Sequence, residues 1–286
     1  MSSDFVVQDN DFLSIKNSIR WGRNLIVNVR RFVQFSLSAI IPCIVLIALS
    51  GGVFGRSPFT LQQILLIDML TGTGAAVSLA TEAPEKLITR SERKKEKESI
   101  LISCMTRDII AQVVYQSLVL GILLFSAPAI FGIKYELYNT PLRDGPNAEP
   151  TNRLIHQTFL FEIFVLMNLF NLFNCRRLST IDHTSINVFS SLVGNWYFLI
   201  VLLVTVNFIF AVSNFVWLRF LFGMAELTGQ MHFVALALGV GSLVVGILVK
   251  LTPLRWAKSL GDSESEDAKV WRHSFTSLDG SLTLQK

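Results

Sequence analysis

The sequence predicts an all-α integral membrane protein with six transmembrane helices. Of its 286 residues, 51% are hydrophobic and only 16% are charged, whereas soluble domains carry roughly 25% charged residues. Six apolar stretches each come close to the ~20 residues that a helix needs to cross a bilayer. Basic residues also concentrate in the segments that fall on one side of the predicted membrane.

Three parts follow from this pattern. Residues 1–31 are polar and basic, and the loose helical spacing of their apolar residues predicts an amphipathic lead-in. The six-helix domain is predicted over 32–253, and a polar tail with an acidic run follows over 254–286. Pro42 falls inside the first span, where it is expected to kink the helix. The predicted spans are 32–54, 60–81, 109–131, 157–173, 188–212 and 232–251.

The basic residues predict the orientation of the spans. An even number of spans places both termini on one side, and 20 of the 25 lysines and arginines fall on that side, seven of them in the charged loop 82–107. The positive-inside rule therefore places both termini in the cytoplasm, or in the matrix if the membrane is the inner mitochondrial one. The sequence leaves open whether that membrane is mitochondrial, plasma or vacuolar.

Several site classes are not expected. The three cysteines, Cys43, Cys104 and Cys175, are too few and too scattered for a disulfide framework or a zinc site. Nucleic-acid binding is not expected, because the basic residues are balanced by acidic ones and follow the membrane topology. His156 and His232 lie at span ends, where interfacial side chains are favoured over metal ligands. No cofactor is expected.

One apolar stretch carries most of the functional information. Residues Ile64–Pro84, ILLIDMLTGTGAAVSLATEAP, contain a single mid-segment acid, Asp68, and end in L-A-T-E-x-P. An ionisable group inside a membrane span is a functional-site hypothesis by default. Further motifs occur in order along the chain. They are Ser3–Val7, Asp9–Phe12, W-G-R-N at Trp21–Asn24, Phe32–Leu37, the series from His156 through Asn171 and Asn174 to Arg176, Leu238-Gly239, and Pro253.

Together these motifs resemble calcium-transporting P-type ATPases, the plasma-membrane type in particular, over about residues 2–256. The resemblance implies the fold of the pump's fifth to tenth transmembrane helices. The 286 residues contain no D-K-T-G-T phosphorylation motif, so they hold no aspartate for an acyl-phosphate intermediate. No catalytic residue is therefore expected. The chain is not expected to be an enzyme unless a separate catalytic half exists.

The resemblance also implies a calcium site, which this sequence has largely lost. In the resembled pumps the sixth helix supplies an Asn and an Asp one turn later; these positions fall on Asp68 and Gly72. The Asn of the fifth helix falls on Ile40. Calcium takes six to eight oxygen ligands, several of them carboxylates, and the hydroxyls of Thr71 and Thr73 are weak substitutes. No metal site is expected, with Asp68 as the residual candidate.

Two interpretations of Asp68 are open. It is either a relic or repurposed cation or proton site, or a buried carboxyl that is protonated or paired. Glu162, in the fourth span, is its possible polar partner. On the same span Asn168, Asn171 and Asn174 recur at i, i+3 and i+6, which favours interhelical hydrogen bonding over the lining of a path. Small residues at Gly72, Gly74, Ala75, Ala76 and Ser78 are typical of a close-packed helix surface.

Three functions are therefore considered. The favoured one is a degenerate calcium-pump-like membrane domain acting as a non-catalytic accessory subunit, with other membrane subunits and lipids as partners. The alternative is the C-terminal half of a split cation pump, whose partner would be a separate half. The third is an independent channel or carrier that uses Asp68 and Glu162.

Overall fold

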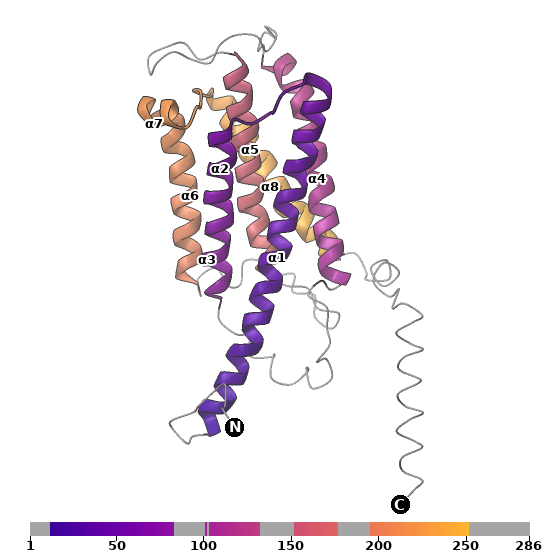
Figure 1. Ribbon diagram of the computed structural model, residues 1–286, viewed down its shortest axis with the longest axis vertical. Helices are drawn as coiled ribbons and strands as arrows, with labels where there is room; N and C mark the ends of the chain where they lie inside the picture. The colour runs from indigo at the N-terminus through magenta and orange to yellow at the C-terminus, as the bar shows by residue number, and fades with distance from the viewer. Residues whose placement is uncertain (1–11, 83–100, 102, 132–151, 177–194, 252–286) are drawn as a thin grey trace, which may run out of the picture.

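The computed structural model describes residues 12–82, 101, 103–131, 152–176 and 195–251, and within them every regular element is helical. Six helices are long and apolar enough to cross a membrane, which confirms the predicted fold class. Figure 1 shows them as a bundle. The elements are α1 (Phe12–Phe54), α2 (Leu61–Ile67), η1 (Asp68–Thr73), α3 (Gly74–Ala80), α4 (Ser103–Ile130), α5 (Asn152–Cys175), α6 (Trp196–Asn214), α7 (Val216–Leu221) and α8 (Gly229–Leu251).

The predicted spans fall on these helices, with α2, η1 and α3 together forming the second one. Between α6 and α8 the structure adds a short helix, α7, where the sequence predicts only a connection. Four predicted features lie wholly or mostly outside the described residues. These are the N-terminal residues 1–11, most of the charged loop 82–107, the start of the fifth span at 188–194, and the tail 254–286.

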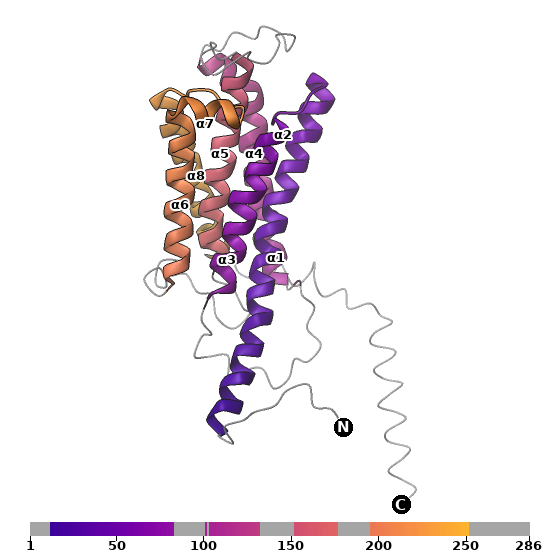
Figure 2. The same ribbon diagram turned by 60° about the vertical axis from the view of Figure 1, so that its left-hand side comes forward.

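The lead-in and the first span form one uninterrupted helix. α1 runs for 43 residues and continues through Pro42, so at 1.5 Å per residue it is ~64 Å long. That is about twice the ~30 Å hydrocarbon thickness of a bilayer. In Figures 1 and 2 its N-terminal half projects beyond the bundle as a stalk. The boundary at residue 31 is therefore a change of environment and no break in the helix.

Helix α5 is the core of the bundle. Of its 24 residues, 20 are buried, whereas the lipid-facing helices bury only part of their surface. Polar side chains on α5 must therefore find partners inside the protein. The Asn171 amide donates to Ser38 Oγ on α1 at 2.6 Å, and the Asn174 amide donates to the Ser242 carbonyl on α8 at 3.1 Å. These bonds confirm the interhelical role predicted for two of the three asparagines.

Glycines on α8 permit its close approach to α5. A Cβ atom on Gly239 would lie 2.9 Å from a ring carbon of Phe170, and one on Gly246 would overlap the Asn174 amide. On the second span, a Cβ atom on Gly74 would lie 2.9 Å from Val201 of α6. The small residues thus bring helix backbones close together, as small-residue interfaces do in membranes.

A buried ion pair ties the second span to α5 at the end of the bundle from which the stalk projects. Arg176 donates through Nε and Nη2 to the carboxylate of Glu82, at 3.0–3.2 Å. The Asn195 amide adds a bond to Glu82 Oε2 at 3.0 Å, and the Asn24 amide donates to the Glu82 carbonyl at 2.8 Å. The Arg176 guanidinium also stacks 4.1 Å from the centre of the Phe198 ring. Asn24 of α1, Arg176 directly after α5 and Asn195 directly before α6 therefore converge on Glu82.

Replacing Arg176 with methionine is expected to destabilise the bundle strongly. The change leaves the Glu82 carboxylate buried without its main partner, which costs about 3–5 kcal/mol in comparable pairs. The measurement is the melting temperature of the detergent-solubilised protein. Arg219→Met is the matched control: the Arg219 side chain is 12% exposed, but its partner Glu226 is 69% exposed, so the change leaves no buried carboxylate behind and should cost about 1 kcal/mol or less. Equal melting temperatures for the two variants would contradict the prediction.

Gly246→Ala is expected to lower the melting temperature, because the added methyl group overlaps the Asn174 amide. Overpacking of this kind costs about 1–3 kcal/mol. At Gly121 a Cβ atom would meet Leu49 Cδ2 at 3.6 Å, an ordinary contact, so Gly121→Ala should leave the melting temperature unchanged or raise it. A neutral Gly246→Ala would show that α5 and α8 pack more loosely than described.

Candidate functional site

The second span changes its helical geometry where its acidic residue lies. Regular α-helix gives way to a π-helical stretch over Asp68–Thr73 and resumes at Gly74. Within it the Thr71 hydroxyl donates to the Ile67 carbonyl at 2.7 Å. π-Helical turns are rare and occur frequently at functional sites. This stretch is therefore the first place to look for a site.

The structure places Asp68 on the outside of the bundle. Its side chain is exposed, and it lies along the helix so that a Cβ atom on Gly72 would be 3.1 Å from Asp68 Oδ1. Leu65 and Met69, its neighbours on the same face, are also exposed, by 63% and 62%. The interpretation of Asp68 as a buried carboxyl is therefore wrong for the chain alone. Ile40 is likewise exposed, by 54%.

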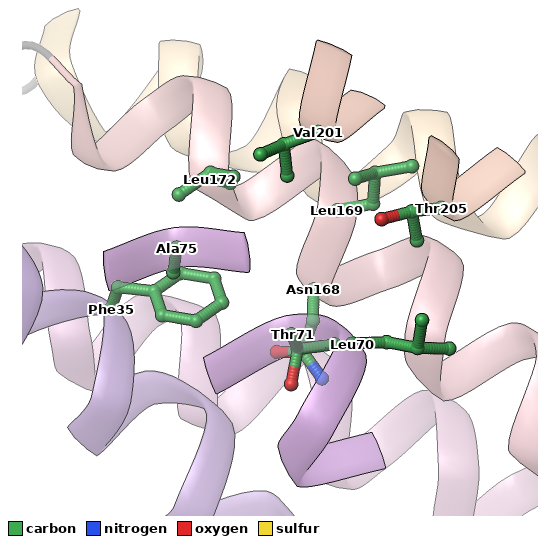
Figure 3. A pocket seen from close by; sticks show the side chains of 9 residues that line it. All are labelled: Phe35, Leu70, Thr71, Ala75, Asn168, Leu169, Leu172, Val201 and Thr205. Atoms are coloured by element: carbon green, nitrogen blue, oxygen red, sulfur yellow. The ribbon is translucent and has the colours of Figure 1, made fainter. Parts of the chain in front are cut away.

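A small cavity lies behind the π-helical stretch, on the inner side of the span (Figure 3). About 10 Å³ of it is open to the centre of a water molecule, which is roughly room for one water. Three of its lining residues are polar, Thr71, Asn168 and Thr205, but the surface that the lining turns to the cavity is apolar. The lining residues are Phe35, Leu70, Thr71, Ala75, Asn168, Leu169, Leu172, Val201 and Thr205.

Asn168 differs from Asn171 and Asn174, the other two asparagines of α5 that share its spacing. Its amide nitrogen donates to the Phe164 carbonyl of its own helix at 3.0 Å. Its Oδ1 is buried and accepts no hydrogen bond from any described residue. Among the described residues Asn168 therefore bonds only within its own helix, whereas Asn171 and Asn174 connect helices.

Glu162 lies elsewhere in the bundle and has a different partner. Its Oε1 is 2.7 Å from Nδ1 of His232 on α8. In the described part of the chain no hydrogen bond or ion pair joins it to Asp68. His232 is partly exposed, but His156 is buried, with Nε2 3.3 Å from the Leu123 carbonyl. His156 lies near the start of α5, which begins at Asn152, and packs against other helices there.

The chemistry of the site follows from these positions. Calcium takes six to eight oxygen ligands with several carboxylates among them, but every residue that lines the cavity is neutral. Among the described residues no group of three or more histidine, cysteine, aspartate or glutamate side chains could hold a metal ion. The cavity surface is apolar and offers no ligand to an ion. The one carboxylate of the π-helical stretch faces outward.

Comparisons with known proteins place the bundle among ion-pump sequences. A family model described as "Cation transporting ATPase, C-terminus" matches residues 56–252. The chain is 32% identical over 253 residues to the probable calcium-transporting ATPase 8, plasma membrane-type, of Oryza sativa subsp. japonica, covering 88% of this chain and 23% of that protein. It is 29% identical over 274 residues to the plasma membrane calcium-transporting ATPase mca-1 of Caenorhabditis elegans, covering 94% and 21%. The chain thus spans less than a quarter of these relatives.

Asn168→Leu is expected to leave the melting temperature unchanged or to raise it, because Asn168 makes no bond to another helix and lines a mostly apolar cavity. Asn171→Leu removes the bond to Ser38 and should destabilise by about 0.6–1.7 kcal/mol, as for other interhelical bonds in membranes. Thermal unfolding in detergent measures both. A destabilising Asn168→Leu would show that its side chain has a structural role.

Proposed function

Because this chain belongs to the C-terminal family of cation-transporting ATPases, we propose that it is a non-catalytic membrane subunit built on the pump's C-terminal helices. It is a multi-pass membrane protein. In this role the bundle serves as a helical building block that binds other membrane proteins. Both of its termini face the cytoplasm or the matrix, in keeping with the distribution of its basic residues.

One observation carries this proposal: the carboxylate of the π-helical stretch and the cavity lie on opposite sides of the helix. The carboxylate of Asp68 is on the outer face, whereas the cavity on the inner face has a neutral lining. Gly72, one turn later, contributes no ligand, and Ile40 presents an apolar side chain. A transport site for calcium needs several carboxylates around one ion, and this arrangement offers one carboxylate that points away from the cavity.

The interactions that hold the helices together support the same proposal. The Glu82–Arg176 pair and the asparagine bonds of α5 are well formed, and glycines still allow α8 to approach α5 closely. A fold whose packing is intact while its ion ligands are replaced is consistent with a structural role.

The second candidate is the C-terminal half of a split cation pump. It is favoured by the exposure of Asp68, since a helix from a separate half could cover that face and add ligands. The third candidate, an independent channel or carrier, has less support. The cavity holds roughly one water, and Glu162 is engaged with His232.

Purification from the native membrane in a mild detergent distinguishes the first two candidates. We expect a stable complex whose other subunits carry no D-K-T-G-T phosphorylation motif. Recovery of a polypeptide with that motif, in constant ratio to this chain through two chromatographic steps, would instead establish the split pump.

Asp68→Asn is expected to leave calcium uptake by native membrane vesicles unchanged, because Asp68 is the only carboxylate of the π-helical stretch and one carboxylate cannot supply a high-affinity site. ATP-driven uptake of radioactive calcium is measured in cells that carry the wild-type chain, the variant or no chain. A severalfold loss of uptake in the variant, equal to that without the chain, would contradict the accessory role.

A further inference from the structure

From the position of Asp68 we infer that the outer face of α2, η1 and α3 is a docking surface for a transmembrane helix of a partner subunit. That helix carries a lysine or arginine near the middle of its span. The inference rests on the proposed function, because it names the chemistry of the partner that an accessory subunit requires.

The depth of Asp68 is the first step. The span runs over Leu61–Ala80, and Asp68 lies seven residues from its start, so it is ~10 Å along a helix with a rise of 1.5 Å per residue. The hydrocarbon layer is ~30 Å thick, which places the carboxylate well inside it. Acidic side chains at such depth are rare and almost always face another protein group or a water-filled cavity.

Nothing within the described bundle satisfies this carboxylate. No described residue makes a hydrogen bond or ion pair with its oxygens, which lie over Gly72. Asn207 and Asn214, two other exposed polar side chains, behave differently. Each donates its amide to the carbonyl four residues earlier, at 2.8 Å. An ionised carboxylate has no proton to donate in this way, so an ionised Asp68 needs a donor from outside the described bundle.

The surroundings of Asp68 match a helix-binding surface. Exposed apolar side chains precede and follow it on the same face of the span. Gly72, one turn later, has no side chain, so the backbone of another helix could approach closely there. Ionisable side chains within membrane spans usually pair with one another or with backbone groups, and apolar neighbours of this kind would exclude lipid and water from such a pair. The exposed apolar residues of this face are Leu61, Leu65, Met69 and Val77.

The sign of the charge selects the partner. A lysine or arginine would neutralise Asp68 where the dielectric constant is low and the attraction is strong. A partner with its own carboxylate would repel Asp68 unless a divalent cation lay between them, and the neutral cavity lining adds no charge to hold one. Lipid chains alone would leave the charge unneutralised. The occupant that fits is therefore a helix with a basic residue at mid-depth.

Photo-crosslinking in native membranes tests the contact. A photoreactive amino acid replaces Met69, next to Asp68. The matched control replaces Val240, which is exposed on the all-apolar stripe of α8 formed by Leu236, Val240, Val244 and Leu248. We expect the Met69 probe to give one crosslinked polypeptide, attached through a transmembrane segment with a mid-span lysine or arginine. We expect no such product from Val240.

Charge exchange then tests the pairing. Asp68→Lys should lower the amount of co-purified partner at least about tenfold, a change equivalent to one decade in affinity. Exchanging the partner's basic residue for aspartate should do the same, and combining both changes should restore the complex. Size-exclusion chromatography verifies that each variant is folded. If Asp68→Lys does not fold, Asp68→Leu decides, with the same loss of partner expected.

Wild-type recovery of the partner with Asp68→Leu would overturn the inference and show that Asp68 is a neutral acid facing lipid. A stable accessory complex without any crosslink from Met69 would also overturn it, and would leave the proposed function intact. A crosslink to a polypeptide with D-K-T-G-T and a mid-span acid, formed only with calcium present, would overturn both.

Discussion

The central constraint on this protein is that the interior of a membrane supplies no water to its polar groups. Helix α5 shows how the constraint is met, because most of its side chains are enclosed and its amides bond to neighbouring helices. At its end Arg176 is held between Glu82 and the face of Phe198. The backbone carbonyl of Glu82 also accepts from Asn24 of α1, and its carboxylate accepts from Asn195 before α6, so this one residue joins the end of the second span to three neighbouring segments.

Asp68 differs from many polar side chains of the described bundle. Many of these reach another helix, as Asn171 does, or their own backbone, as Asn207 does, although the buried amide of Gln116 also bonds to no described residue. Asp68 does neither, and it lies where the span departs from α-helical geometry. A structural defect of this kind would be expensive in an isolated protein. The unpaired carboxylate of Asp68 is explained if a helix of another chain packs on this surface and binds it.

Much of the fold follows from the sequence because hydropathy and charge determine which segments cross a bilayer. The continuity of α1 does not, since charged residues such as Arg30 and Arg31 end the apolar stretch while the helix continues. The π-helical turn also escapes prediction, because it shifts hydrogen bonds without changing composition. α7, with six residues, is too short to show a period.

The candidate site was predicted less well than the fold. The family resemblance identifies Asp68, Gly72 and Ile40 as the positions of the ion ligands. The direction in which each side chain points, however, depends on how the helices are rotated against each other. The pairing of Glu162 with His232 depends on that rotation too. The Glu82–Arg176 pair was missed although a signal existed: two residues of opposite charge each end an apolar span within a motif, at the same side of the membrane.

The unbroken course of α1 has a mechanical consequence. A helix ~64 Å long is about twice as long as the hydrocarbon layer is thick, so a force on its stalk would tilt the whole helix as one body. A tilt of about 10° would displace one end by ~11 Å relative to the other over that length. Because the amide of Asn171 holds α1 at Ser38, force applied to the stalk in the aqueous compartment would be transmitted straight to the centre of the bundle.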